Sequence, residues 1–452
     1  MVNMFKNLSV LLVSFTLGTA AQLPAQTFKT LHSFTNGEGI YPSGSLVLSS
    51  NILYGTAIEG GAASNGTIFA LKTDGSGVTN LHSFTSDDGV SPSGGVVLPA
   101  GVLFGTTASG GSSGNGTIFS INVDASGFKT LHMFASGSGS WPNLTNSDGA
   151  KPWGELAFSG ETLYGVTESG GSNGSGTLFA INVSGTEFTN LYSFSPDASE
   201  PNSVIISGDT LYGTTYAGTN VSGTIFAIKT DGTHFTNLHS FSRTEMNGAF
   251  PFAGLTLSGK TLYGTTSAGG SNNSGTVFAI NTNGTEFTIL HDFNARIDGG
   301  SPESGLVLWG HTLYGTTTSG IDINKGTVFA LDIDGTSFTT FYTFSGGIDG
   351  ASPSGRLILS GNKLYGTTTF GGTSNNGTVF SFDVVTLLSI TPYSGNLILA
   401  WPDHPSGFTL QSTTNLLSPV WDTVSSQAVL VNGQNIVIDP SAGSQRFYRL
   451  SQ

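Results

Sequence analysis

The sequence contains no cysteine and few charged residues. The absence of cysteine from all 452 residues excludes a disulfide framework and thiolate metal sites. Charged residues make up 9% of the chain, against about 25% in typical soluble proteins. Disordered chains are charged and poor in aromatic residues, whereas this chain is 11% aromatic and contains 65 glycines. The composition is typical of many short strands joined by tight turns.

Positive charge is particularly scarce. The 14 basic residues face 28 acidic ones, which gives a net charge of −14. Such a surface repels nucleic acid and anionic lipid, since both carry negative charge. We therefore expect no nucleic-acid partner. Cations and neutral polymers such as glycans fit this charge better.

Long apolar runs are also missing, and the longest lies at the N-terminus. Lys6 precedes a short apolar segment, Leu8 to Gly18, whereas a membrane span needs about 20 apolar residues. The small residues Thr19, Ala20 and Ala21 follow, as signal peptidase requires. This pattern predicts a signal peptide over residues 1–21 and no membrane span in the mature chain. We expect a secreted, periplasmic or cell-surface protein.

Four short motifs recur seven times in a fixed order. An aromatic residue followed by glycine occurs at Tyr54, Phe104, Tyr164, Tyr212, Tyr263, Tyr314 and Tyr365. A Gly-Thr-aliphatic-Phe motif starts at Gly66, Gly116, Gly176, Gly223, Gly275, Gly326 and Gly377. A motif of the Leu-His-Ser-Phe type starts at Leu31, Leu81, Leu131, Leu191, Leu238, Leu290 and Phe341. A proline before an apolar run occurs at Pro42, Pro92, Pro152, Pro201, Pro251, Pro302 and Pro353.

Each repeat predicts four strands. In the first repeat they are Ser45 to Leu48, Ile52 to Thr56, Thr67 to Lys72 and Val78 to Phe84, separated by Gly, Asn, Asp and Ser clusters. The strands carry apolar residues on both faces, which indicates sheets covered on both sides. Stacked blades of a β-propeller bury both faces of every sheet.

The two ends of the repeat predict how the ring closes. The chain begins with a fourth-strand motif, Phe28 to Phe34, and its seventh repeat ends with a third strand, Thr378 to Asp383. The N-terminal strand would therefore complete the last blade, which leaves no exposed sheet edge. We predict an all-β fold with a seven-bladed β-propeller over residues 27–384.

These motifs resemble the GloVer (Gloeo/Verruco) tandem-repeat family of exported bacterial proteins. The resemblance covers about Phe28 to Asp383 and depends on seven copies of motifs such as Leu-Tyr-Gly-Thr-Thr and Gly-Thr-Val-Phe. It implies an exported, propeller-like protein, often tethered to the cell envelope. It implies no particular reaction.

The repeat stops near Val384, and residues 385–452 predict a separate module. Short strands separated by turn residues indicate a small β-sandwich, and this segment resembles the fibronectin-like C-terminal modules of exported bacterial proteins. We expect Trp401, Phe408 and Trp421 to belong to its core.

Repeat spacing predicts where a binding site would lie. Almost all length variation falls in the crossover from the fourth strand of one repeat to the first strand of the next. That crossover shares a propeller face with the loop between the second and third strands, and loops on a rigid scaffold commonly carry function. Residues that depart from the repeat there are Tyr41, Trp141, Lys151, Trp153, Glu200, Phe250, Phe252 and Glu303. Aromatic rings beside carboxylates suit carbohydrate, although the same side chains could simply plug the channel.

A second candidate site is a repeated set of acidic residues four positions before each proline. Its members are Glu38, Asp88, Asp148, Asp197, Asp298 and Asp349, with Asn247 in the remaining repeat. A ring of carboxylates would bind calcium. Alternatively, these residues form the crossover turns, which is the interpretation that we favour. The repeated histidines are expected to pack between blades.

No catalytic motif is evident, so we favour a monomeric, non-catalytic extracellular binding or surface protein that needs no cofactor. Its partner would be an extracellular polysaccharide or a cell-surface protein. One alternative is a polysaccharide hydrolase or lyase that uses Asp148, Glu200 or Glu303. Another is a purely structural component of the envelope.

Overall fold

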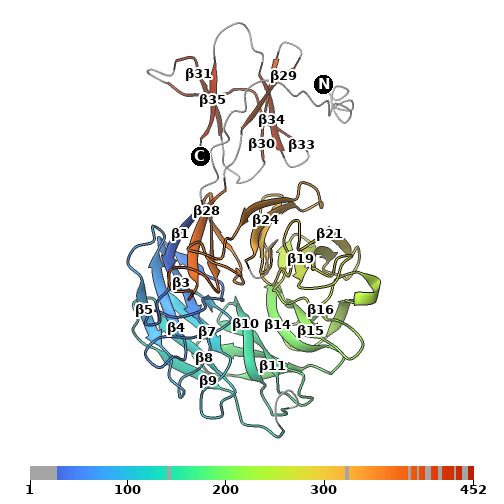
Figure 1. Ribbon diagram of the computed structural model, residues 1–452. Helices are drawn as coiled ribbons and strands as arrows, with labels where there is room; N and C mark the ends of the chain where they lie inside the picture. Colours follow the sequence, from blue (N-terminus) through green and yellow to red (C-terminus); the bar gives the residue numbers. More distant parts are fainter. Residues whose placement is uncertain are drawn as a thin grey trace.

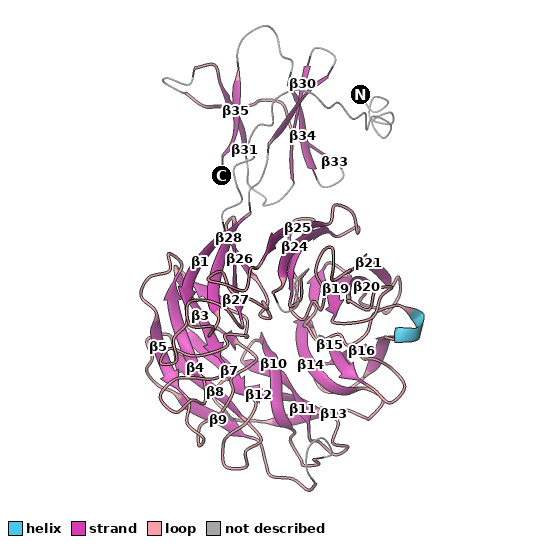
Figure 2. Cartoon of the chain, viewed as in Figure 1, coloured by secondary structure: helices cyan, strands magenta, loops and turns pink. Residues whose placement is uncertain are grey.

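The computed structural model describes residues 28–139, 144–320, 325–384, 388–393, 396–402, 409–415, 420–431, 434–439 and 446–451. In this part of the chain almost all regular structure is β-strand, as Figure 2 shows; the exception there is a short 3₁₀ turn, η2 (Arg243–Glu245). No helix in the described residues is long and apolar enough to cross a membrane.

Up to Val384 the described strands form seven four-stranded antiparallel sheets around a common centre (Figure 1). The first sheet contains β2 (Val47–Ser49), β3 (Ile52–Ala57), β4 (Thr67–Lys72) and β5 (Thr79–Ser83). The second contains β6 (Val96–Val97), β7 (Val102–Thr107), β8 (Thr117–Asn122) and β9 (Lys129–Met133). The third contains β10 (Ala150–Ser159), β11 (Thr162–Ser169), β12 (Thr177–Asn182) and β13 (Thr189–Ser193).

The next three sheets follow the same order. The fourth contains β14 (Ser199–Ser207), β15 (Thr210–Ala217), β16 (Thr224–Lys229) and β17 (Thr236–Ser240). The fifth contains β18 (Thr256–Ser258), β19 (Thr261–Thr266), β20 (Thr276–Asn281) and β21 (Thr288–Asp292). The sixth contains β22 (Val307–Trp309), β23 (Thr312–Thr317), β24 (Thr327–Asp332) and β25 (Thr339–Thr343).

The seventh sheet combines the two ends of the repeat. It contains β26 (Ile358–Ser360), β27 (Lys363–Thr368), β28 (Thr378–Asp383) and, as its fourth strand, β1 (Phe28–Ser33). β1 is antiparallel to β28, with Phe28 opposite Phe382 and Ser33 opposite Thr378. The Phe28 ring stacks on Tyr342 of the sixth sheet at a centroid distance of 4.0 Å.

The repeated glycines are explained by close packing. A Cβ atom on Gly55 would lie 2.7 Å from the Phe69 ring, so the glycine of the aromatic-Gly motif makes room for the phenylalanine on the neighbouring strand. A Cβ atom on Gly66 would lie 2.4 Å from Cδ of Pro92 in the next sheet. The Gly-Thr motif and the repeated proline are therefore two halves of one contact between sheets.

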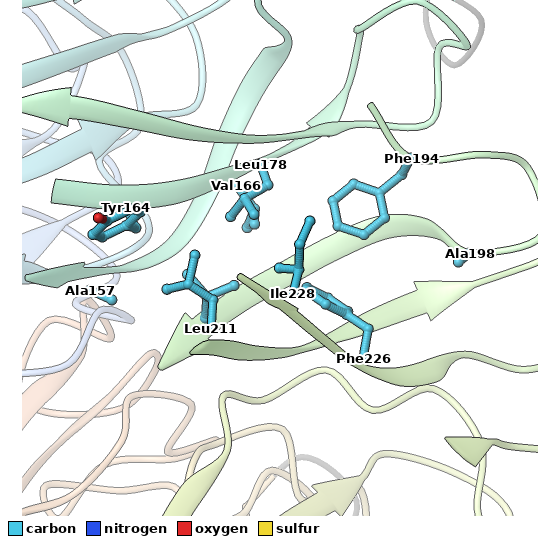
Figure 3. Packing of buried hydrophobic residues seen from close by; sticks show 10 residues of the cluster. Ala157, Tyr164, Val166, Leu178, Phe194, Ala198, Leu211, Phe226 and Ile228 are labelled. Atoms are coloured by element: carbon cyan, nitrogen blue, oxygen red, sulfur yellow. The ribbon is translucent and has the colours of Figure 1, made fainter. Parts of the chain in front are cut away.

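Hydrophobic clusters join each sheet to the next. Figure 3 shows one of them, in which Val166 and Leu178 of the third sheet pack with Leu211 and Phe226 of the fourth. A cluster of the same kind joins the seventh sheet to the first through Leu31, Phe34, Leu53, Phe69 and Val379. Burying such side chains contributes about 1.5–3 kcal/mol each, so contacts between sheets provide much of the stability.

The described residues beyond Val384 form two further antiparallel sheets. One contains β29 (Ser389–Tyr393), β30 (Asn396–Pro402), β33 (Val429–Val431) and β34 (Gln434–Asp439). The other contains β31 (Thr409–Thr413), β32 (Asp422–Thr423) and β35 (Phe447–Ser451). Trp401 is buried with Leu399, Leu410 and Val437, whereas Trp421 is partly exposed under the Arg449 guanidinium. Phe408 lies outside the described residues.

Candidate functional site

The crossovers are anchored to the preceding sheet in the same way in every repeat. The residue before each proline has a positive φ of 51–61°, and none of the seven is a glycine. This left-handed conformation costs about 1–2 kcal/mol for a residue with a side chain. Its N–H group donates to a backbone carbonyl of the preceding sheet's loop, as Tyr41 does to Asn376 at 2.9 Å. Each crossover therefore enters the next sheet in a fixed direction.

A cavity of about 490 Å³ opens where the first strands of all seven sheets meet. The residue after each proline lines it in every repeat. These residues are Ser43, Ser93, Trp153, Asn202, Phe252, Glu303 and Ser354. Residues of the loops after β3, β23 and β27 also line it, namely Ile58, Thr318, Thr369 and Phe370. The cavity therefore lies at the face that carries the crossovers and these loops.

The cavity wall is chemically asymmetric. The seventh, first and second sheets contribute serines at the repeated position, whereas the third, fifth and sixth contribute Trp153, Phe252 and Glu303. The Trp153 and Phe252 rings are arranged edge to face with their centroids 6.3 Å apart. Glu303 makes no hydrogen bond or ion pair to any described residue, and burial raises the pKa of its carboxyl group. One half of the wall is thus small and polar, and the other is aromatic and acidic.

The serine half contains hydroxyl groups without partners. Ser93 is 8% exposed, and its Oγ has no hydrogen-bond partner in the described structure. A threonine follows the aromatic-Gly pair in six repeats, with Val166 in the third, and these threonines show the same asymmetry. Thr265 donates to the Ser304 carbonyl of the next sheet at 3.3 Å, whereas the hydroxyls of Thr56 and Thr367 are buried without a partner. A buried hydroxyl without a partner costs about 1–3 kcal/mol. Of these three hydroxyls, that of Ser93 belongs to a residue that lines the cavity, so it can form a hydrogen bond with a ligand there.

An ion pair crosses the cavity between opposite sheets. Arg356 Nη1 of the seventh sheet lies 3.8 Å from Glu155 Oε2 of the third, and both side chains are about one-third exposed. Arg356 Nε also donates to the Leu306 carbonyl at 3.1 Å. Sequence reasoning did not select this pair. The sequence does contain a signal for this pair, because both residues stand three positions after the proline of their repeat and carry opposite charges.

The other predicted aromatic and charged residues do not line the cavity. The Phe250 and Phe252 rings both contact Tyr216, with centroid distances of 4.8 and 6.0 Å respectively. Tyr41 contacts Phe370 at the cavity wall, with a centroid distance of 5.1 Å. Trp141 lies outside the described residues.

Glu200 and Lys151 lie close together without lining the cavity. Burial raises the pKa of the Glu200 carboxyl, the nearby Glu168 raises it further, and Lys151 opposes the shift. Tyr216, which sequence reasoning did not identify, lies near enough to both Glu200 and Glu303 to be affected by their charges. Its pKa is raised first by burial and then by the charges of Glu200 and Glu303.

The repeated carboxylates are bound within their own crossovers. Asp88 Oδ2 lies 3.0 Å from His82 Nε2, and Asp88 Oδ1 accepts a 2.7 Å bond from the Thr85 N–H group. Glu38, Asp148 and Asp298 each pair with a histidine in the same way. Asp349 accepts a hydrogen bond from the Tyr342 hydroxyl instead. Asp197 is an exposed exception. The described residues contain no group of three or more His, Asp or Glu side chains placed to hold a metal ion.

The repeated histidines form part of the contacts between sheets. His82 of the first sheet stacks on Phe128 of the second, with ring centroids 3.7 Å apart. His291 stacks in the same way on Phe338 at 3.6 Å. This agrees with the predicted packing role of the histidines. Their pairing with the crossover carboxylates was not predicted.

The Gloeobacter/Verrucomicrobia repeat family matches three overlapping segments of the chain, residues 13–149, 142–322 and 309–396. The chain therefore belongs to this family, which confirms the resemblance seen in the sequence. No curated protein matches the sequence.

Two solved structures with a similar fold are oligogalacturonate lyases. One, in complex with manganese, is 10% identical over 80% of this chain and 93% of its own, with a TM-score of 0.53. The other, from Vibrio parahaemolyticus, is 9% identical over 80% of this chain and 94% of its own, with a TM-score of 0.51. At these identities the similarity shows the fold alone, an all-β, propeller-like arrangement.

Proposed function

We propose that residues 27–384 form a closed, seven-bladed β-propeller exported by the signal peptide of residues 1–21. The junction between the seventh and first sheets supports closure, because it repeats the contacts of the other junctions. Gly377 faces Pro42 as Gly66 faces Pro92. Residues 385–452 would form a β-sandwich-like module carried on the propeller.

We further propose that the propeller is a non-catalytic binding protein that takes an extracellular polysaccharide into its central cavity. One observation carries this proposal: the seven repeats place equivalent residues around one cavity, and Trp153, Phe252 and Glu303 replace the serine found in three of them. Sugars present apolar faces that stack on aromatic rings and hydroxyls that can pair with Ser93.

Binding is better supported than hydrolysis or elimination. Glycoside hydrolysis commonly uses two carboxyl groups placed on either side of the bond. Asp148 accepts bonds from the Ala135 N–H group and pairs with His132, and neither Asp148 nor Glu200 lines the cavity. The acidic residues that line it are Glu303 and Glu155, and Glu155 is already paired with Arg356.

A glycan array screened with the mature protein tests the proposal. We expect binding that Trp153→Ala reduces at least tenfold and that Trp421→Ala, a tryptophan change outside the cavity, leaves intact. Equal binding by the two variants would show that the glycan does not bind in the cavity.

A second array with a calcium chelator tests the crossover carboxylates. Lost binding would support calcium at these residues, whereas unchanged binding would leave them as turn-forming residues.

A further inference from the structure

Glu303 is not one of the repeated crossover carboxylates, and it differs from all of them except the exposed Asp197 in having no partner among the described residues. The crossover carboxylates are paired with a histidine or tyrosine, as Asp298 is with His291 at 2.9 Å. Glu303 faces the cavity without a hydrogen bond or ion pair to the described residues. Placing an unpaired carboxylate at a partly buried site costs free energy. The folded protein therefore maintains an acceptor that only a ligand or solvent can satisfy.

The surroundings of Glu303 favour a cation. Phe252 occupies the equivalent position on the adjacent sheet, and Trp153 lies edge to face with Phe252. Tyr216 contacts Phe252 edge to face, with centroids 6.0 Å apart. Aromatic faces attract ammonium groups through their quadrupoles, and a carboxylate adds direct charge attraction. Aromatic rings and a carboxylate that line the same cavity have the chemistry to bind an organic ammonium group.

The basic residue at the cavity does not neutralise Glu303. Arg356 is the one cationic side chain among the described lining residues. Its guanidinium is committed to Glu155 and to the Leu306 carbonyl. The protein as a whole carries a net charge of −14, which attracts cations to its surface.

Building on the proposed polysaccharide binding, we infer that the ligand is an amino sugar with a free ammonium group, for which Glu303 is the counter-ion. Trp153 and Phe252 stack on the sugar ring and on the carbon that carries the nitrogen. The hydroxyls of the serine half bind the neutral hydroxyl groups. N-acetylation removes the positive charge and would therefore remove the preference.

Isothermal titration calorimetry with glucosamine oligomers and matched N-acetylglucosamine oligomers tests this inference. At pH 7 we expect the wild type to bind the free amine at least tenfold more tightly. Glu303→Gln should abolish this preference, because the free amine loses its counter-ion. Because burial penalises the Glu303 charge, the Gln variant should melt at the same temperature or higher, which separates lost binding from misfolding.

Four other outcomes would count against the inference. Equal affinity for both oligomers, or an ammonium preference that survives in Glu303→Gln, overturns it. Binding of a neutral glycan that depends on Trp153 but shows no ammonium preference overturns this inference while the proposed function stands. If wild-type protein binds no glycan on the array, the proposed function fails and the inference fails with it.

Discussion

Pro42 packs against Gly377, so the beginning and the end of the repeat meet at one junction. The adjacent backbone strengthens this contact, since the Tyr41 N–H group donates to the Asn376 carbonyl at 2.9 Å. Gly377 has a φ of +95°, and a Cβ atom there would lie 2.6 Å from Cδ of Pro42. The junction therefore depends on glycine for both its backbone conformation and its close approach.

The first prediction concerns this junction. Gly377→Ala should lower the free energy of unfolding by roughly 2–4 kcal/mol, because it combines a strained φ with a steric clash. Gly361→Ala is the matched control, since Gly361 has a φ of +58° and no atoms near its Cβ position. The control should cost only about 1 kcal/mol. Urea denaturation measures both, and equal losses would show that the Pro42 contact contributes nothing.

The second prediction separates stability from binding at the serine half of the cavity. Ser93→Ala removes a buried hydroxyl without a partner, so the free protein should be equally stable or more stable by up to about 1 kcal/mol. Its affinity for a glycan should fall, because the ligand loses a hydrogen bond. Thermal unfolding and calorimetry on the same samples measure the two effects.

Ser304→Ala provides the contrast. Ser304 also lines the cavity, but its Oγ is hydrogen-bonded to Thr316 Oγ1 at 2.8 Å. This substitution should destabilise the protein by about 1 kcal/mol, since it leaves the threonine hydroxyl without that partner. A Ser93→Ala variant that is destabilised as much as Ser304→Ala would contradict the assignment of Ser93 as a ligand-binding hydroxyl.

The third prediction concerns His239, whose repeat has Asn247 in place of a carboxylate. Burial lowers the pKa of His239 to about 4. Because the unfolded chain takes up this proton near pH 6.5, stability should be lost as the pH falls from about 6.5 toward 4. Asn247→Asp places a carboxylate beside the imidazole and should raise the pKa of His239 by about one to three. Histidine resonances followed by NMR across this pH range measure the change.

The reverse substitution in the neighbouring sheet is the control. Burial lowers the pKa of His291, and Asp298 opposes this shift. Asp298→Asn should therefore lower the pKa of His291 further. Unchanged histidine titrations in both variants would show that the crossover carboxylates act on the backbone alone.

The repeat predicts the strands well because each motif has a local physical cause. β4 begins and ends where the sequence placed it, at Thr67 and Lys72, and β3 extends the predicted strand by one residue, to Ala57. The first strands vary more: β6 has two residues, whereas β10 has ten. Their length depends on pairing with neighbours around the centre, which a single repeat does not encode.

The candidate site could be predicted only in part. Trp153, Phe252 and Glu303 stand out because they replace serine in aligned repeats, and all three line the cavity. Glu200 and Phe250 stand out equally but precede their prolines, where a positive φ changes the direction of the chain. The sequence alone does not show this difference in direction. The sequence alone also does not show which distant repeats face each other across the cavity.

The last prediction is a pH dependence of ligand binding. Burial raises the pKa of Glu303 above its ordinary value of 4.5, so protonation of this carboxyl begins at a higher pH than for an exposed glutamate. An ammonium ligand needs the ionised form. Wild-type affinity for a glucosamine oligomer should therefore fall as the pH decreases through this raised value, while a neutral oligomer should show little change.

The control must retain the other charged and titratable groups around Glu303. Glu155 and Arg356 line the same cavity, and Tyr216 lies within reach of the Glu303 charge. Glu303→Gln retains all three, so its weaker affinity should stay flat between pH 7 and the acid range if Glu303 is the titrating group. Calorimetry at a series of pH values measures both proteins. A parallel loss of affinity in wild type and variant would show that another group titrates. Glu155 would then be the first residue to replace by glutamine, because it lines the same cavity.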